Sequence, residues 1–398
     1  MHKMENIHQI RYCKKCIIPE TRPHTEIGED GICSGCKYFD QRNNIDWDKR
    51  KSELQKIFNK YKNNNNNYDC IIPSSGGKDS TYQVLKVLEF GLKPLVITVT
   101  TDMLTPIGRK NIDNLKNKGI DCLEFSPNPV LRKKINKLTL STVGDLTWTE
   151  EVAICCAVTR FSIKMGVPLI IWGENPENEN GGPEQNSDFF DDIIQKHDDE
   201  WFETFRTNGL KSSDILNFWK KEGVKDIDLQ PYTYPDKSEI QKNGTIGIFL
   251  GHYLPWDGHK NAEFSIKNGL TTYDKWVEGS IVNYENLDNY QMRIHDYFKF
   301  LKYGYDRVSD WSSLAIRRER MSREEAVELS QTVGGKYPDT YLGKSLEEIL
   351  DYVGLTKKEF DDVCYKFTNK KIFKKNSDGT LQYDNKGNLI KTNYDNIE

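Results

Sequence analysis

Short apolar runs alternate with amphipathic stretches along the central part of the chain. The apolar runs lie at residues 70–72, 95–99, 120–125, 168–172 and 246–254. Between the first two, Thr81, Val84 and Leu88 recur at helical steps and Gly91 supplies a stop, which predicts a helix. A second helical stretch runs from about residue 108 to residue 119. Strands that alternate with helices in this way predict an α/β fold, a parallel sheet with helices on both faces.

Helix-start signals mark the sequence on both sides of the last apolar run. Thr147 and Glu150 have the spacing of a capping box and predict a helix that ends near Gly166. Three further pairs predict a C-terminal helical module: Ser322 with Glu325, Ser345 with Glu348, and Thr356 with Glu359. The tail carries Asp-Gly at 378–379 and Lys-Gly at 386–387 between short apolar stretches, so it is either a hairpin or a frayed end.

The chain has 398 residues, which is enough for several domains. We expect a cysteine-rich module at residues 1–50, the α/β domain at 68–265, the helical module at 266–368 and the tail at 369–398. A tract of asparagines at 63–67 is the expected linker between the first two.

Charge and hydropathy narrow the class of protein. The net charge of −4 argues against a large nucleic-acid footprint, because such domains usually carry a basic excess. The N-terminal segment lacks the apolar stretch of a signal peptide, and no apolar run is long enough to span a membrane. We therefore expect a cytoplasmic protein with no membrane partner.

A glycine turn follows the first apolar run. Residues 72–80 read IPSSGGKDS and lead into the first predicted helix. Backbone N–H groups at a helix start favour an anion, and Gly76 and Gly77 let the backbone approach it closely, which predicts a nucleotide phosphate site. The spacing differs from the GxxxxGK[ST] loop of kinases, because Asp79 separates Lys78 from Ser80. The alternative is a turn that binds nothing.

Ligands of parallel sheets bind beyond the carboxyl ends of the strands. Three such ends, at residues 74–80, 100–105 and 173–182, should therefore face a substrate. The third is rich in glycine, acids and amides, and its place after a core strand favours a binding loop over a surface connection.

Two CxxC pairs lie near the N-terminus. They are Cys13 with Cys16 and Cys33 with Cys36, at the spacing of structural zinc sites. Four thiolates close a tetrahedral shell, so the ion would be structural, and its binding would supply the folding free energy of a module too short for its own core. Iron in place of zinc, or two unconnected thiol pairs, are the alternatives.

The remaining cysteines suggest no second site of this kind. Cys155 and Cys156 are adjacent on a predicted helix and point about 100° apart, so they cannot ligate one ion together, and we expect them in the core. Residues 31–35 also match GxCxG, the nucleophile elbow of class I glutaminases. We reject this match because Cys33 already has a CxxC partner and the elbow needs a strand and a helix around it. A class II glutaminase needs an N-terminal cysteine, which Met1-His2 does not offer, so the chain is not expected to make its own ammonia.

With these motifs in place, the chain resembles the N-acetyl sugar amidotransferases, PP-loop enzymes of bacterial surface-glycan biosynthesis. The glycine loop resembles their SGGxDS signature. The other shared motifs are the cysteine pairs, Pro19 to Pro23, Thr105 to Gly108 with Asn111, Trp172 to Asn175, Pro255 to Asp257, His295 to Tyr297, Lys302 to Tyr305, Asp310, Ile316 with Arg317, and Ser322 to Ala326. The ENENGG stretch after Trp172 and the pair Gly334-Gly335 depart from the family pattern, which puts the identity of the sugar in doubt.

The resemblance implies a PP-loop ATPase fold and an AMP-forming reaction. An acetamido group of a sugar, nucleotide-linked or related, would be adenylated on its oxygen and converted by ammonia to an acetamidino group. The implied cofactors are ATP, Mg²⁺ and a structural Zn²⁺. The implied catalytic residues are Lys78, Asp79, Glu174 and Asn175. The implied ATP-binding residues are Ser74, Ser75, Gly76, Gly77, Lys78, Asp79, Ser80, Thr98, Thr100 and Gly173. The candidate sugar-side residues are Tyr253, Trp256, Asp257, Asp310 and Arg317, for which core packing or salt bridges between helices are the structural alternatives.

The resemblance also implies partners. A separate glutaminase subunit of the class I amidotransferase type would deliver ammonia, with an associated cyclase-like barrel protein. Two rival functions stay open at this point. One is a PP-loop tRNA thiolase, which would want cysteines near the strand ends; the other is a catalytically silent nucleotide-binding scaffold.

Overall fold

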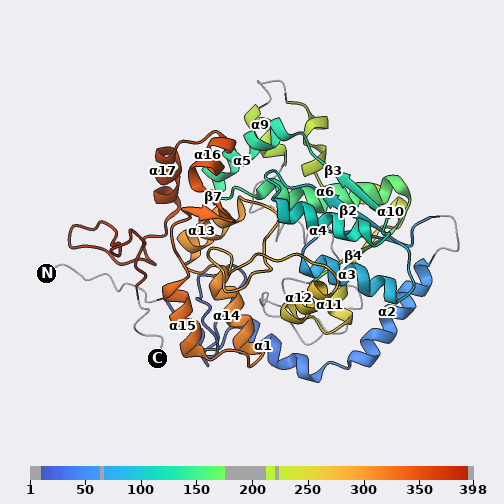
Figure 1. Ribbon diagram of the computed structural model, residues 1–398, viewed down its shortest axis with the longest axis horizontal. Helices are drawn as coiled ribbons and strands as arrows, with labels where there is room; N and C mark the ends of the chain where they lie inside the picture. The colour runs from blue at the N-terminus through green and yellow to red at the C-terminus, as the bar shows by residue number, and fades with distance from the viewer. Residues whose placement is uncertain (1–9, 63–66, 175–211, 220–223, 393–398) are drawn as a thin grey trace.

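The computed structural model describes residues 10–62, 67–174, 212–219 and 224–392 (Figure 1). Its centre is a five-stranded parallel sheet in the order β3-β2-β1-β4-β5. The strands are β1 (Cys70–Pro73), β2 (Pro94–Val99), β3 (Cys122–Phe125), β4 (Leu169–Trp172) and β5 (Ile246–Phe249). The expected α/β fold is confirmed, and the strand order places the topological switch between β1 and β4.

Both faces of the sheet are covered, as the near-continuous apolar strands require. The helices of this part are α2 (Trp47–Tyr61), α3 (Lys78–Glu89), α4 (Pro106–Asn117), α5 (Pro129–Val143), α6 (Trp148–Met165), α9 (Ser212–Trp219), α10 (Lys237–Asn243), α11 (Leu250–Tyr253) and α12 (Gly258–Lys267), with the 3-10 helix η4 (Asp226–Tyr232). Successive side chains of β1 point to opposite faces: Ile71 packs in the cluster of α5 and α6, and Ile72 in that of α2 and α3.

The C-terminal region is mostly helical, as expected. Its helices are α13 (Met292–Tyr303), α14 (Arg307–Arg317), α15 (Arg323–Thr332), α16 (Leu346–Val353) and α17 (Lys357–Phe367), with a two-stranded ribbon of β6 (Thr340–Tyr341) and β7 (Lys344–Ser345). They enclose a core that contains Phe298, Leu350 and Phe360. The tail follows the hairpin alternative, since antiparallel bridges join Phe373 to Lys391 and Tyr383 to Leu389.

The N-terminal module contains α1 (Ser34–Gln41) and the 3-10 helix η1 (Arg42–Asn44). In Figure 1 it lies beside α14 and α15, the orange helices of the C-terminal region. The following helix, α2, was not expected from the sequence. It packs Leu54 and Phe58 into the core under the sheet, so the α/β body begins before residue 68.

Two local expectations were wrong. Residues 246–254 are not one strand, because β5 ends at Phe249 and the chain turns directly into α11. Thr147 precedes α6 but makes no capping box: its hydroxyl contacts His295 and Asp145, and Glu150 accepts a hydrogen bond from the backbone N–H of Asp102. No helix among the described residues is long and apolar enough to cross a membrane.

Candidate active site

A cavity of about 270 Å³ opens at the carboxyl ends of β1 and β4, the predicted position. Two of the three expected strand ends contribute to it: the loop after β1, and Trp172 with Gly173 at the end of β4. Its wall also includes Gly108 and Asn111 on α4 and residues 284–288 of the C-terminal region, and it is completed by Gln83, Ile154 and Leu270.

The loop between β1 and α3 is shaped for an anion. Ser74 and Ser75 brace it by accepting hydrogen bonds from the N–H groups of Gly76 (3.0 Å) and Gly77 (3.4 Å). Gly76 has φ +78°, and a Cβ there would lie 2.7 Å from the backbone nitrogen of Ile112, so the turn requires glycine. Gly77 precedes α3 without a capping side chain, which leaves the first N–H groups of α3 available to a phosphate.

Lys78 is held between two carboxylates at the cavity wall. Its ammonium group contacts the carboxylate of Asp79 and lies 2.7 Å from Glu285, and it sits over the ring of Trp311 at 5.3 Å. Burial disfavours the charge, but Asp79 and Glu285 outweigh burial and raise the pKa of Lys78. Lys78 therefore stays a cation, poised beside the phosphate loop.

Asp79 is oriented from outside the loop. Asn261 on α12 donates a hydrogen bond to Oδ1 of Asp79 (2.9 Å), and Ser265 donates to the carbonyl oxygen of Lys78 (2.6 Å). These two contacts anchor the first turn of α3 to α12. The carboxylate of Asp79 thereby keeps a fixed direction toward the cavity.

Sequence reasoning missed the segment 284–288. Glu285 and Asp288 line the cavity, and burial raises the pKa of Asp288 to about 6. Gly108 permits this segment to approach, because a Cβ there would lie 2.6 Å from the Cα of Asp288. Asn111 exchanges two hydrogen bonds with the backbone of Thr271, which also ties the C-terminal region to α4.

Charged side chains of alternating sign continue from the cavity to the N-terminal module. The successive pairs are Glu285 with Arg307 (3.9 Å), Arg307 with Asp296 (3.1 Å), Asp296 with Lys299 (3.5 Å), Lys299 with Asp310 (3.0 Å) and Asp310 with Arg22 (3.5 Å). Burial alone would raise the pKa of Asp296, but Arg307 and Lys299 lower it to about 2. Asp310 belongs to this network of ion pairs and does not line the cavity.

The other sequence-derived candidates have different positions. Thr98 is buried within β2, and Thr100 continues the ladder by donating its N–H to Phe125 (2.9 Å). Neither lines the cavity. Glu174 follows Gly173 and acts electrostatically on Lys78. Asn175 and most of the expected binding loop lie outside the described residues.

The remaining sugar-side candidates do not reach the cavity either. Tyr253 and Trp256 are buried in the core under the sheet. Asp257 caps α12 and forms a bidentate pair with Arg320 (2.9 and 2.5 Å). Arg317 points its guanidinium at the cysteine cluster. For all of these, packing or ion pairing between elements is the role that the structure supports.

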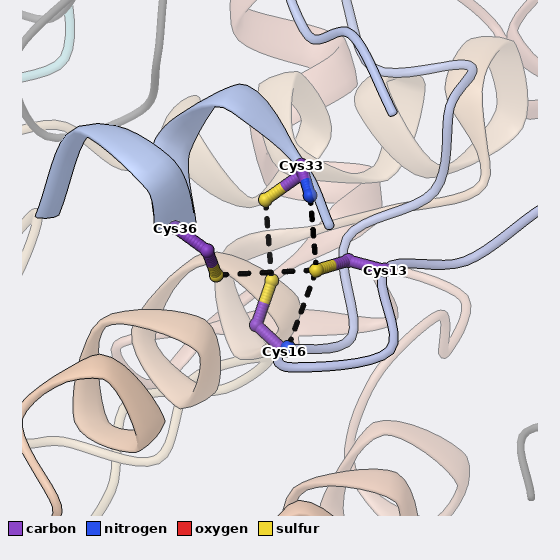
Figure 2. A group of neighbouring side chains, drawn as sticks. All are labelled: Cys13, Cys16, Cys33 and Cys36. Carbon is purple, nitrogen blue, oxygen red and sulfur yellow. Dashed lines mark hydrogen bonds between the residues drawn. The ribbon is translucent and has the colours of Figure 1, made fainter. Parts of the chain in front are cut away.

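The four predicted cysteines converge in a buried cluster (Figure 2). Their sulfur atoms all lie within 4.8 Å of one another, and backbone N–H groups of Cys16 and Cys33 point at the sulfur of Cys13 (3.4 and 3.3 Å). Arg317 places Nε 3.4 Å from the sulfur of Cys36. Four buried thiols with N–H donors and a nearby cation fit a structural Zn²⁺, because these contacts would balance the negative charge of a four-thiolate shell.

The C-terminal region is the part that a family comparison identifies. Residues 271–386 match the model of the C-terminal domain of LPS biosynthesis protein WbpG-like proteins. The region is therefore similar to that domain, and we call residues 271–386 the WbpG-like domain. It contains the motifs around His295, Lys302, Asp310, Arg317 and Ser322 on which the resemblance rested, and the match supports that resemblance. The WbpG-like domain also supplies Tyr284 to Asp288, so it completes the cavity.

No curated protein matched the chain. Among solved structures, NMN synthetase from Francisella tularensis aligns over 56% of this chain and 96% of its own, with 11% identity and a TM-score of 0.24. The fold assignment rests on the order of the strands in the sheet and on the cavity at the switch point between β1 and β4.

Proposed function

We propose that the protein is an ATP-dependent amidotransferase of lipopolysaccharide biosynthesis. It would convert an acetamido group of a sugar, nucleotide-linked or related, to an acetamidino group through an O-adenylyl imidate. The observation that carries the proposal is the cavity itself, in which an SGGKDS loop at the strand ends faces residues 284–288 of a WbpG-like domain. The loop supplies a place for ATP, and the domain ties the chain to LPS biosynthesis.

The residues present suit adenylyl transfer. An amide carbon is a poor electrophile, so its oxygen must first become a leaving group, and attachment of AMP achieves this. The N–H groups of the first turn of α3 would cradle the phosphates, and Gly76 and Gly77 would let the phosphates approach the backbone closely. Lys78 would offset the charge that develops on pyrophosphate. Ammonia would then attack the imidate carbon, AMP would depart with the oxygen, and the nitrogen would lose a proton.

Mg²⁺ would bring its usual charge neutralisation to the phosphates when bound. The carboxylates of Asp79 and Glu285 are oxygen donors of the type that this ion prefers, and both line the cavity. Asn261 would hold Asp79 in the orientation that such a ligand needs.

The proposal includes a separate glutaminase as the source of ammonia. Cys33, the residue of the GxCxG match, lies in the four-cysteine cluster and faces Arg317, so it is not placed as a nucleophile. We expect the isolated chain to use ammonium salts at raised pH and to ignore glutamine. Efficient use of glutamine by the chain alone would contradict this part.

The tRNA thiolase alternative receives no support from the cysteines. Cys122 lies at the amino end of β3, the edge opposite the site. Cys155 and Cys156 are buried in the core, where desolvation raises the pKa of the Cys156 thiol. Within the described chain, no cysteine lines the cavity.

A direct test is mass spectrometry of acetamido nucleotide sugars incubated with ATP, Mg²⁺ and ammonium. The expected result is AMP, pyrophosphate and a sugar lighter by about one mass unit, since NH replaces O. Formation of ADP would overturn the proposal, and absence of pyrophosphate with every sugar would favour the silent scaffold. A Cys155→Ser, Cys156→Ser double variant should keep full activity, whereas a thiolase that used these thiols would lose it.

A further inference from the structure

Asp288 differs from the other acids of the cavity because it has no cationic partner. The charged residues of the described cavity wall are Lys78 and three acids, Asp79, Glu285 and Asp288. Asp79 and Glu285 both contact the ammonium group of Lys78. Asp288 forms no ion pair with the described residues, and the charged group that acts on its pKa is Glu285, which has the same sign. The cavity therefore contains one carboxylate that no positive charge of the described chain balances.

The backbone holds Asp288 in place at the cavity wall. Its carbonyl oxygen accepts hydrogen bonds from the N–H of Thr105 (3.1 Å) and from the hydroxyl of Thr101 (3.1 Å). These contacts tie Asp288 to the loop after β2, and Gly108 lets the segment approach α4 closely. The strand end at residues 100–105, which was expected to face a substrate, thus contributes to the cavity by positioning Asp288.

Burial makes the unbalanced charge of Asp288 costly. Desolvation raises the pKa of this carboxyl to about 6, and Glu285 adds to the shift. At pH 8 the group is still ionised. Buried charges in proteins are usually paired, because water no longer stabilises them, and carboxyls with a raised pKa gather at functional sites. Asp288 is therefore suited to meet a cation that the chain itself does not supply.

The proposed reaction makes such a cation from a neutral group. The acetamido group of the substrate carries no charge, but once its oxygen is bonded to AMP, the nitrogen that keeps its hydrogen becomes an iminium cation. Ammonia then adds to the carbon, the C–O bond to AMP breaks, and one proton leaves for solvent. The acetamidino group that remains is an amidinium cation at neutral pH.

An amidinium ion matches a carboxylate in shape as well as in charge. It is planar, and its two nitrogen atoms present N–H groups on one side, as the guanidinium of arginine does in bidentate ion pairs. A neutral amide gains much less from the same carboxylate. Asp288 would therefore stabilise the iminium intermediate and the product more than the substrate, and such differential stabilisation accelerates a reaction.

We propose that Asp288 is a catalytic residue that pairs with the positive charge of the iminium and amidinium groups. The inference rests on the proposed function and deepens it, because it assigns the reacting group of the sugar to the wall formed by residues 284–288. That group stays close to ATP, since Asp288 and the phosphate loop line the same cavity. Ile154 and Leu270 give this cavity apolar surface for the methyl group.

The first test uses the full chain and two small probes of the same shape, acetamidinium chloride and the neutral acetamide. Binding is measured by saturation-transfer NMR at pH 8 and constant ionic strength. We expect the wild type to bind acetamidinium at least tenfold more tightly than acetamide, or by about 1.4 kcal/mol. Asp288→Asn should remove this preference without weakening ATP binding. Asp274→Asn, at an exposed position of the same domain, is the matched control.

The second test measures the folding and the turnover of the same variant. Asp288→Asn should keep or raise the melting temperature at pH 8, because it removes an unbalanced charge. With a sugar that the wild type converts, it should lower kcat about 100-fold and leave the KM for ATP unchanged. Asp288→Glu, which keeps the charge, should recover part of the rate.

The outcomes separate this inference from the proposed function. If the wild type binds both probes equally, or if Asp288→Asn keeps the preference for acetamidinium, the inference fails whatever the reaction is. If Asp288→Asn converts a sugar at the wild-type rate, the inference fails alone. A variant that loses only its affinity for Mg²⁺ would make Asp288 a metal ligand, which also overturns the inference. If the preference depends on Asp288 but no sugar releases pyrophosphate, the proposed reaction fails and the cation site stands.

Discussion

Glu150 should make the stability of the protein fall as the pH rises. Burial raises the pKa of this carboxyl from its ordinary value of 4.5 to about 8, although Arg132 opposes the shift. Below pH 4.5 the group is protonated in both the folded and the unfolded chain. Above that pH the unfolded chain releases the proton first, so the folded state loses relative stability until the pH passes about 8.

The perturbation is Glu150→Gln, which keeps an acceptor for the N–H of Asp102 and removes the titration. The whole interval from 4.5 to about 8 corresponds to about 5 kcal/mol, at about 1.4 kcal/mol per pH unit. The side chain of Glu150 is only half-buried, so solvent screens part of the cost of ionising it in the folded protein. We therefore expect a gain of about 2 kcal/mol for the variant at pH 8 and none at pH 4.5.

The assay is denaturant unfolding of both proteins from pH 4.5 to pH 9. The difference between variant and wild type isolates Glu150, because other groups such as Asp288 titrate in both. Glu239→Gln, at an exposed position on α10, controls for loss of a surface charge. A difference that stays flat with pH, or a variant that is less stable than the wild type at pH 8, would refute the reasoning.

Three further predictions concern the loop and the metal site. Lys78→Met should slow pyrophosphate release about 100- to 1,000-fold with an unchanged circular dichroism spectrum, since it removes the cation beside the phosphates; a near-normal rate would remove its assigned role. Gly76→Ala should weaken ATP binding in calorimetry at least tenfold, because the new Cβ meets Ile112, whereas Gly244→Ala, also at positive φ but in open space, should not. Removal of metal by a chelator should release one zinc ion per chain, measured by atomic absorption, and lower the melting temperature; an unchanged melting temperature would show that the cysteines do not hold a structural ion.

The sequence was informative where the signal is local. The loop at residues 74–80 and the strands on either side of it follow from apolar runs, glycine and helix-start chemistry within a short window. The two CxxC pairs likewise predict a metal site from their spacing alone. These features could be placed without knowledge of any partner.

The features that could not be predicted from the sequence depend on contacts between segments that are distant along the chain. Glu285 looks like any acid in a polar stretch, and only the fold brings it to Lys78. Thr147 and Glu150 have the spacing of a capping box. In the structure, however, Thr147 bonds to His295, and Glu150 accepts a hydrogen bond from the N–H of Asp102. Asp257 and Arg317 carry charges typical of a binding site, but Asp257 already pairs with Arg320 and Arg317 already contacts the sulfur of Cys36.

Arg317 has a consequence for how this protein can be divided. Its guanidinium belongs to the WbpG-like domain, while the sulfur atoms that it faces belong to the N-terminal module. If the chain were cut between the two, one fragment would keep the Arg317 guanidinium without its sulfur partners, and the other would keep the four cysteines without this cation. We therefore expect the N-terminal module and the WbpG-like domain to fold only when both are present in one chain, even though the central sheet separates them along the sequence.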